Sequence, residues 1–178
     1  IPGTETCLKI GGFVRFQTSF GRNIGGDSTI ADGGLSDWDA FTKVAVNFDA
    51  RNDTELGTLR SYIAIEANAD NDTTNDGEFD IDEAFIELGG FKVGFFYSWW
   101  DSGINGETDS LGNLTEFNSI AYTYDGGTWR AGLSLDEIED HDTATASNDG
   151  HNYVGVAGTV GFSLGGVNLD VLGGYDNN

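Results

Sequence analysis

A two-residue alternation of apolar and polar positions runs through nine segments of this chain. The segments are 8–16, 44–48, 59–65, 84–88, 91–95, 120–124, 129–135, 154–162 and 167–171. Their apolar positions, such as Ile63 and Leu133, never hold a charged residue, whereas charged residues such as Arg60, Glu87 and Arg130 occupy the positions between. This period indicates β-strands with one apolar and one polar face. Such strands need either a protein core or a lipid bilayer on the apolar side.

The connections between these segments alternate between short and long. The short ones are 52–54, 89–90, 125–128 and 163–166, and the long ones are 21–38, 69–79, 100–118 and 139–151. Gly89-Gly90 and Asp125-Gly126 are strong hairpin signals. Short turns at one end and long loops at the other are typical of outer-membrane barrels. We therefore predict an all-β fold, an antiparallel up-and-down transmembrane β-barrel; a soluble sandwich or jelly roll is the alternative.

Aromatic residues gather near both kinds of connection. Phe48, Phe91, Tyr124, Trp129 and Phe162 lie beside short turns, and Phe20, Trp38, Tyr97, Trp99, Trp100 and Tyr153 lie towards long loops. Aromatic side chains favour the two membrane interfaces, although they are also common in strands generally. The distribution favours the barrel.

The composition excludes several classes of protein. A net charge of −22 argues against nucleic acid as a partner. No apolar stretch approaches the length of a membrane-spanning helix, so a membrane role would have to come from strands. Phosphate-loop and nucleophile-elbow motifs do not occur, and we predict neither an enzyme nor a bound cofactor.

Nine strands do not close an antiparallel barrel, because the first and the ninth run in the same direction. Open strand edges are prohibitively costly in lipid. We therefore expect further strands after Asn178, and we interpret residues 1–178 as a single barrel region cut at both ends.

Five sequence blocks resemble the alphaproteobacterial general porins of the rhizobial type. They are Ile1-Pro-Gly-Thr-Glu-Thr-Cys-Leu8, Thr54-Glu-Leu-Gly-Thr-Leu-Arg60, Phe85-Ile-Glu-Leu-Gly-Gly-Phe91, Tyr97-Ser-Trp-Trp-Asp101 and Ala131-Gly-Leu-Ser-Leu-Asp-Glu137. The resemblance implies a homotrimer of barrels of about 16 strands in the cell outer membrane, of which this chain would be the N-terminal half. It also implies passive diffusion of small hydrophilic solutes and ions, with outer-membrane lipid around the barrel. The family usually has a second cysteine upstream of the one at Cys7, so the partner of Cys7 would lie outside this sequence.

By the same resemblance, residues 100–118 are the loop that folds inward and narrows the pore. Its charged residues are all acidic: Asp101, Glu107, Asp109 and Glu116. Seven of the eight basic residues have the parity of the polar face, namely Lys9, Arg15, Lys43, Arg51, Arg60, Lys92 and Arg130. Strand height places Arg15, Lys43 and Arg60 near mid-barrel and the other four close to the short turns at the mouth. Acids on the loop facing these bases would set a transverse field across the pore. Alternatively, the bases pair with Glu66, Glu83 or Glu87 and only satisfy a polar interior.

A second hypothesis is a soluble secreted acidic β-sandwich that acts as a binding or adhesin module. Residues 72–83 match a calcium-binding loop in part, with Asp72, Asp76 and Glu83 as the candidate ligands. The flanks, however, are predicted to be strands, and the third position is a threonine. His141 and His151 lie in an acidic loop and are interpreted as surface residues. A third, weaker hypothesis is a structural barrel piece whose acidic loops bind surface partners without conducting.

Overall fold

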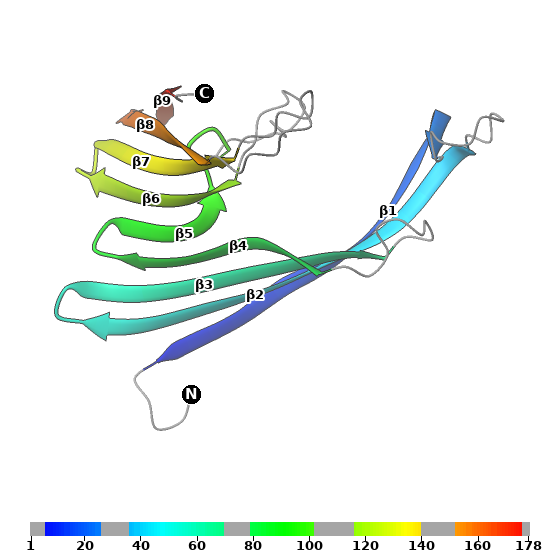
Figure 1. Cartoon of the computed structure of the whole chain (residues 1–178), viewed down its shortest axis with the longest axis horizontal. Helices are drawn as coiled ribbons and strands as arrows, with labels where there is room; N and C mark the ends of the chain where they lie inside the picture. The colour runs from blue at the N-terminus through cyan, green and yellow to red at the C-terminus, as the bar shows by residue number, and fades with distance from the viewer. Residues whose placement is uncertain (1–5, 26–35, 70–78, 102–115, 140–151, 176–178) are drawn as a thin grey trace. The chain divides into compact units, whose positions relative to one another are not determined.

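The computed structural model describes residues 6–25, 36–69, 79–101, 116–139 and 152–175. Within these residues it contains nine strands: β1 (Cys7–Gly25), β2 (Ser36–Thr54), β3 (Gly57–Ala69), β4 (Phe79–Leu88), β5 (Phe91–Tyr97), β6 (Glu116–Asp125), β7 (Trp129–Glu139), β8 (Asn152–Leu164) and β9 (Val167–Tyr175). They form one sheet in chain order, from β1 to β9 (Figure 1). Every alternating segment of the sequence lies in one of these strands. The all-β, up-and-down antiparallel prediction is confirmed.

The chain divides into two compact units. One consists of Ile1–Leu8, Ala50–Tyr62 and Glu83–Asn178, and we call it the β4–β9 unit. The other, the β1–β3 unit, consists of Lys9–Asp49 and Ile63–Asp82. The described residues contain no helix of the length and apolarity required to cross a membrane.

Tight turns join the strands at the short connections. Gly89 and Gly90 link β4 to β5 with φ of 58° and 89°, and Gly165 and Gly166 link β8 to β9 with φ of 57° and 94°. Two consecutive positive φ angles suit the right-handed twist of a hairpin and favour glycine. The β8–β9 turn falls at the end of the predicted 163–166 connection. The β2–β3 turn falls after the predicted 52–54, at 55–56, because β2 continues through Thr54.

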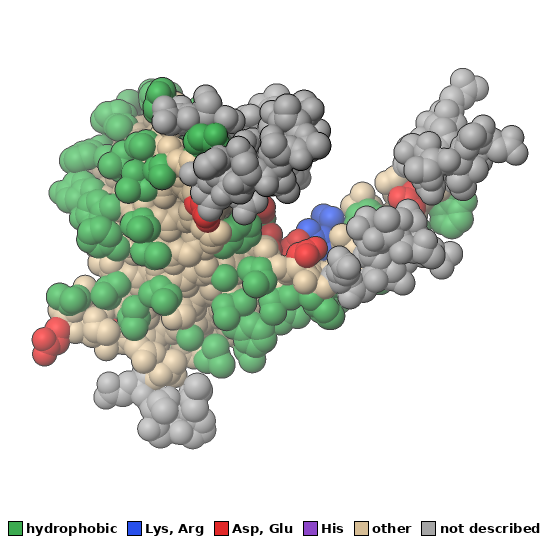
Figure 2. Space-filling view, in the orientation of Figure 1, with side chains coloured by type: hydrophobic (Ala, Val, Ile, Leu, Met, Phe, Trp, Pro, Cys, Tyr) green, Lys and Arg blue, Asp and Glu red, His purple; other side chains and the backbone are tan. Residues whose placement is uncertain are grey.

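The apolar face of the β4–β9 unit is the exposed face. Ile86, Val93, Ile120, Leu133 and Val171 are between 48% and 60% exposed. Several residues on the opposite face are buried, including Phe85, Ala121 and the polar residues Ser134 and Asp136. Figure 2 shows hydrophobic side chains standing out over the surface of the strands. This is the reverse of a soluble sandwich, in which the apolar faces of two sheets bury each other.

Aromatic rings form a band on the exposed face beside the short turns. Phe91 of β5 lies opposite Tyr122 of β6, with ring centroids 4.7 Å apart. Tyr124 and Trp129 are 5.0 Å apart, and Trp129 is paired with Phe162 of β8. The predicted aromatic positions at this end of the β4–β9 unit therefore lie side by side on adjacent strands, as in an interfacial girdle.

Candidate functional site: the polar face of the sheet

The polar face of the β4–β9 unit encloses a hollow of about 470 Å³. Its lining comes from β4 to β9 and from the turn that follows β5. The charged residues of the lining are Glu87, Lys92, Arg130, Asp136 and Asp170. In a closed barrel this face would be the wall of the lumen.

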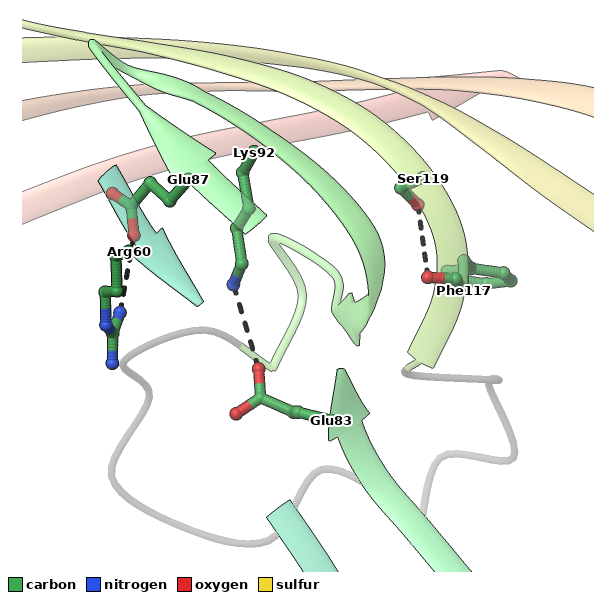
Figure 3. A network of polar contacts seen from close by, with 6 residues as sticks. All are labelled: Arg60, Glu83, Glu87, Lys92, Phe117 and Ser119. Atoms are coloured by element: carbon green, nitrogen blue, oxygen red, sulfur yellow. Dashed lines mark hydrogen bonds and ion pairs between the residues drawn. The ribbon is translucent and has the colours of Figure 1, made fainter. Parts of the chain in front are cut away.

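Two ion pairs hold bases on this wall. Arg60 Nη1 of β3 is 3.3 Å from Glu87 Oε2 of β4, and Lys92 Nζ of β5 is 3.7 Å from Glu83 Oε1 of β4 (Figure 3). Both cations also lie over the ring of Phe85, which is buried between β3 and β5: the Arg60 guanidinium carbon is 5.1 Å from the ring centroid and the Lys92 ammonium 3.8 Å. Ring faces attract cations when water is excluded. The pairs and the ring therefore fix both cations to the wall.

Lys92 is a residue of this wall that the sequence analysis placed near the short-turn mouth. Its backbone is two residues past the Gly89-Gly90 turn, opposite Glu87. Its side chain, however, runs along the sheet to Glu83, and its ammonium lies 4.2 Å from the ring centroid of Phe96. A lysine side chain spans about two residues of a strand. Backbone height alone therefore does not give the height of its charge.

A third pair crosses a strand. Arg130 of β7 donates from Nη2 and Nε to Asp170 Oδ1 of β9, at 2.8 and 3.1 Å. Gly161 of β8 lies between them in register with both. A Cβ at residue 161 would be 2.7 Å from Arg130 Nε. The glycine therefore leaves the space in which this pair forms.

The β1–β3 unit holds the other two predicted wall bases. Lys43 of β2 pairs with Glu66 of β3. The Arg15 guanidinium of β1 lies 5.8 Å from the ring centroid of Phe41 of β2. Lys43 and Arg60 thus adopt the pairing that the sequence left as the alternative to a loop-facing base, and acids and bases are interleaved along both units.

The four acids predicted for the constriction loop divide into two groups. Glu107 and Asp109 lie outside the described residues. Asp101 and Glu116 are described: the Asp101 amide donates to the Ser98 carbonyl at 3.2 Å, and Glu116 begins β6 opposite Tyr97 of β5. These two acids therefore mark the two ends of the predicted loop.

A residue that the sequence analysis assigned to the long-loop aromatics is turned onto the polar face. Trp99 donates from Nε1 to Ser134 Oγ of β7 at 3.0 Å and packs against the buried cluster of Phe85, Phe96 and Ala121. A signal was present in the sequence, because Gly132, Ser134 and Asp136 place small and polar residues at successive positions of one face of β7. Periodicity does not identify the ring that covers them.

The calcium candidates are not assembled in the described residues. Asp72 and Asp76 lie outside the part that the structure describes, and Glu83 pairs with Lys92. Across the described ranges, no group of three or more His, Cys, Asp or Glu side chains could hold a metal ion. His141 and His151 also lie outside those ranges, and Cys7, at the start of β1, is exposed with a free thiol.

Comparison with known proteins assigns the chain to a family. The model of the porin subfamily matches residues 1–178. The chain belongs to this porin family. The membership confirms the predicted resemblance and, with it, the porin fold class, the outer-membrane location and the expectation that the chain is not an enzyme.

Individual relatives of the chain are named as outer-membrane proteins or porins. It is 54% identical to a putative outer membrane protein y4fJ of Sinorhizobium fredii over 93% of the chain and 47% of that relative. It is 46% identical to outer membrane protein IIIA of Rhizobium leguminosarum bv. viciae, over 99% of the chain and 50% of the relative. Porin Omp2b of Brucella abortus is 31% identical over 98% of the chain and 48% of its own length. The chain thus spans about half the length of these curated relatives, and no solved structure matches it.

Proposed function

We propose that the intact protein containing this chain is an outer-membrane porin that forms a passive, water-filled channel for small hydrophilic solutes and ions. The observation that carries the proposal is the sidedness of the sheet: apolar side chains are exposed on one face, and ion pairs and hydroxyl groups line the other. Lipid satisfies the first face and water the second. Membership of the porin family and the outer-membrane names of the relatives support the same function. A homotrimer of closed barrels is part of this proposal.

The proposal includes a constriction by residues 100–118, with Asp101, Glu107, Asp109 and Glu116 facing the wall. The wall bases Lys43, Arg60 and Lys92 each have an acidic partner on a neighbouring strand. Those pairs are close to neutral, and acidic residues outnumber basic ones by 30 to 8 over the whole chain. We therefore expect a modest preference for cations over anions.

The test is single-channel recording in planar bilayers. We expect discrete steps with ohmic current, and reversal potentials in a salt gradient that indicate cation preference at neutral pH. If the intact protein forms no channels, the channel proposal is wrong. If the channels prefer anions, the expected effect of the excess of acidic residues is wrong.

Arg60→Glu tests the wall. A unit charge about 10 Å from a permeating ion is worth about 0.4 kcal/mol in water, or about twofold in relative permeability, and this substitution changes two unit charges. Each unit charge favours the cation and disfavours the anion by about twofold, so we expect the cation-to-anion permeability ratio to rise by up to about 16-fold at low salt and by less at high salt. Arg130→Glu is the matched control, because Arg130 lies beside a short turn and is 56% exposed. Equal effects of the two variants would contradict a constriction at the height of Arg60.

A further inference from the structure

Strand β5 ends in a compact turn that directs Trp99 onto the polar face. The Ser98 carbonyl accepts from the Asp101 amide at 3.2 Å, and the Ser98 hydroxyl accepts from the Trp100 amide at 3.3 Å. Ser98 itself is buried. The turn therefore fixes the backbone on both sides of Trp99, next to residue 100, where the predicted loop begins.

The indole of Trp99 lies in a niche formed by small residues on β6 and β7. A Cβ at Gly132 would lie 2.6 Å from Trp99 Cη2 and 2.8 Å from Cζ2, so only glycine leaves room for the ring. Ala121 of β6 is 3% exposed and belongs to the buried cluster against which Trp99 packs. The ring thus reaches from the end of β5 across to β7.

Hydrogen bonds connect this niche to the other end of the loop. Ser134 accepts from Trp99 Nε1 and donates to Asp136 Oδ2 at 3.0 Å. Asp136 Oδ1 accepts from the Ser119 hydroxyl of β6 at 2.6 Å. Ser119 is only three residues after Glu116, where β6 begins. The carboxylate of Asp136, itself 7% exposed, is therefore linked to the residues on both sides of segment 102–115.

We propose that Trp99 is a positioning residue that anchors the root of the constriction loop to the wall of the lumen through Gly132, Ser134 and Asp136. The inference rests on the proposed channel function and deepens it, since it names what holds the constriction in place. Packing of the ring and a part-buried hydrogen bond to a carboxylate-bound hydroxyl act together here. Loss of the anchor releases the start of the loop from the wall, which widens the constriction and lets its width fluctuate.

The experiment compares four variants of the intact protein in planar bilayers. Trp99→Ala removes the ring and Trp99→Phe removes only the N–H donor. Gly132→Ala inserts a methyl group into the niche. Trp129→Phe is the matched control, because Trp129 is a tryptophan of the exposed face outside residues 100–118 and is 42% exposed. The readouts are single-channel conductance, open-channel noise, and the largest neutral polymer that lowers the conductance.

We expect Trp99→Ala and Gly132→Ala to raise the conductance, increase the noise and admit larger polymers. Trp99→Phe should weaken the anchored state about 2- to 10-fold relative to the released state, which appears as added noise at nearly normal mean conductance. Trp129→Phe should match the wild type. The two conservative variants, Trp99→Phe and Gly132→Ala, decide the test if Trp99→Ala does not assemble.

If the wild type forms channels and both conservative variants have its conductance, noise and polymer cutoff, the anchor is wrong and the channel function stands. Silence from the wild type would instead overturn the proposed function. The two failures are therefore distinguishable.

Discussion

A charged residue placed on the exposed apolar face should destabilise the protein by an amount set by its depth in the bilayer. Leu133 is 57% exposed on that face and is the fifth residue of β7, counted from the short turn. Four steps of about 3.3 Å along a strand tilted by about 40° place it about 10 Å from the turn end of an apolar band about 25 Å tall. Leu133 therefore lies near the midplane of the bilayer.

Leu133→Arg should consequently lower the free energy of unfolding by about 2–4 kcal/mol, the cost of arginine at the midplane. This corresponds to about 30- to 900-fold in the folding equilibrium constant. The assay is reversible urea or guanidinium unfolding of the intact protein in lipid vesicles, followed by tryptophan fluorescence. Because the cost arises from dehydration in lipid, it should hardly depend on salt.

Thr123→Arg is the matched control for this prediction. Thr123 lies on the neighbouring strand β6, is exposed, and lines the hollow on the polar face. An arginine there projects into water and should cost much less. A Thr123→Arg cost equal to that of Leu133→Arg, or a Leu133→Arg cost below about 1 kcal/mol, would refute the assignment of the two faces to lipid and water.

Two further predictions concern the polar face and the turns. Asp136→Ala removes a buried carboxylate that accepts from two hydroxyl groups and should cost about 2–3 kcal/mol of stability in the same unfolding assay. Asp170→Ala removes a partly exposed partner of Arg130 and should cost at most about 1 kcal/mol. The reverse order would contradict the role of the Ser119–Asp136–Ser134 network. Gly90→Ala should cost about 1–3 kcal/mol or more of stability, because φ is 89° and the new Cβ would lie 2.5 Å from the Thr123 carbonyl oxygen. Gly165→Asn should be as stable as the wild type, because φ is 57° and the space around it is open. Equal stability of the two variants would argue against the turn geometry.

Most of the fold followed from local sequence. The alternation in 129–135 assigns Leu133 to one face and Ser134 to the other, since successive side chains of a strand point to opposite sides. Gly89-Gly90 specified its hairpin turn because two positive φ angles exclude most other residues. The β2–β3 turn was displaced from its predicted place because β2 continues through Thr54. The Thr54 hydroxyl then accepts from the Leu56 amide and donates to the Gly57 carbonyl.

The candidate site was less accessible from sequence. Its acids and bases were assigned to the correct face, but their partners depend on how far each side chain extends along or across the sheet. Lys92 reaches Glu83 rather than the mouth, and Arg130 reaches Asp170 over the glycine of an intervening strand. Strand periodicity carries no information about these distances.

The sequence by itself determined the strand order, the two faces of the sheet and the family, because alternation and turn chemistry are local properties of the chain. Only the tertiary structure decided where Trp99 points and what Asp136 holds. Both depend on contacts between residues 17 to 35 positions apart, which form only after β5, β6 and β7 have paired. The sidedness that defines a porin is thus visible in the linear sequence, whereas the anchor proposed for its constriction exists only in the assembled wall.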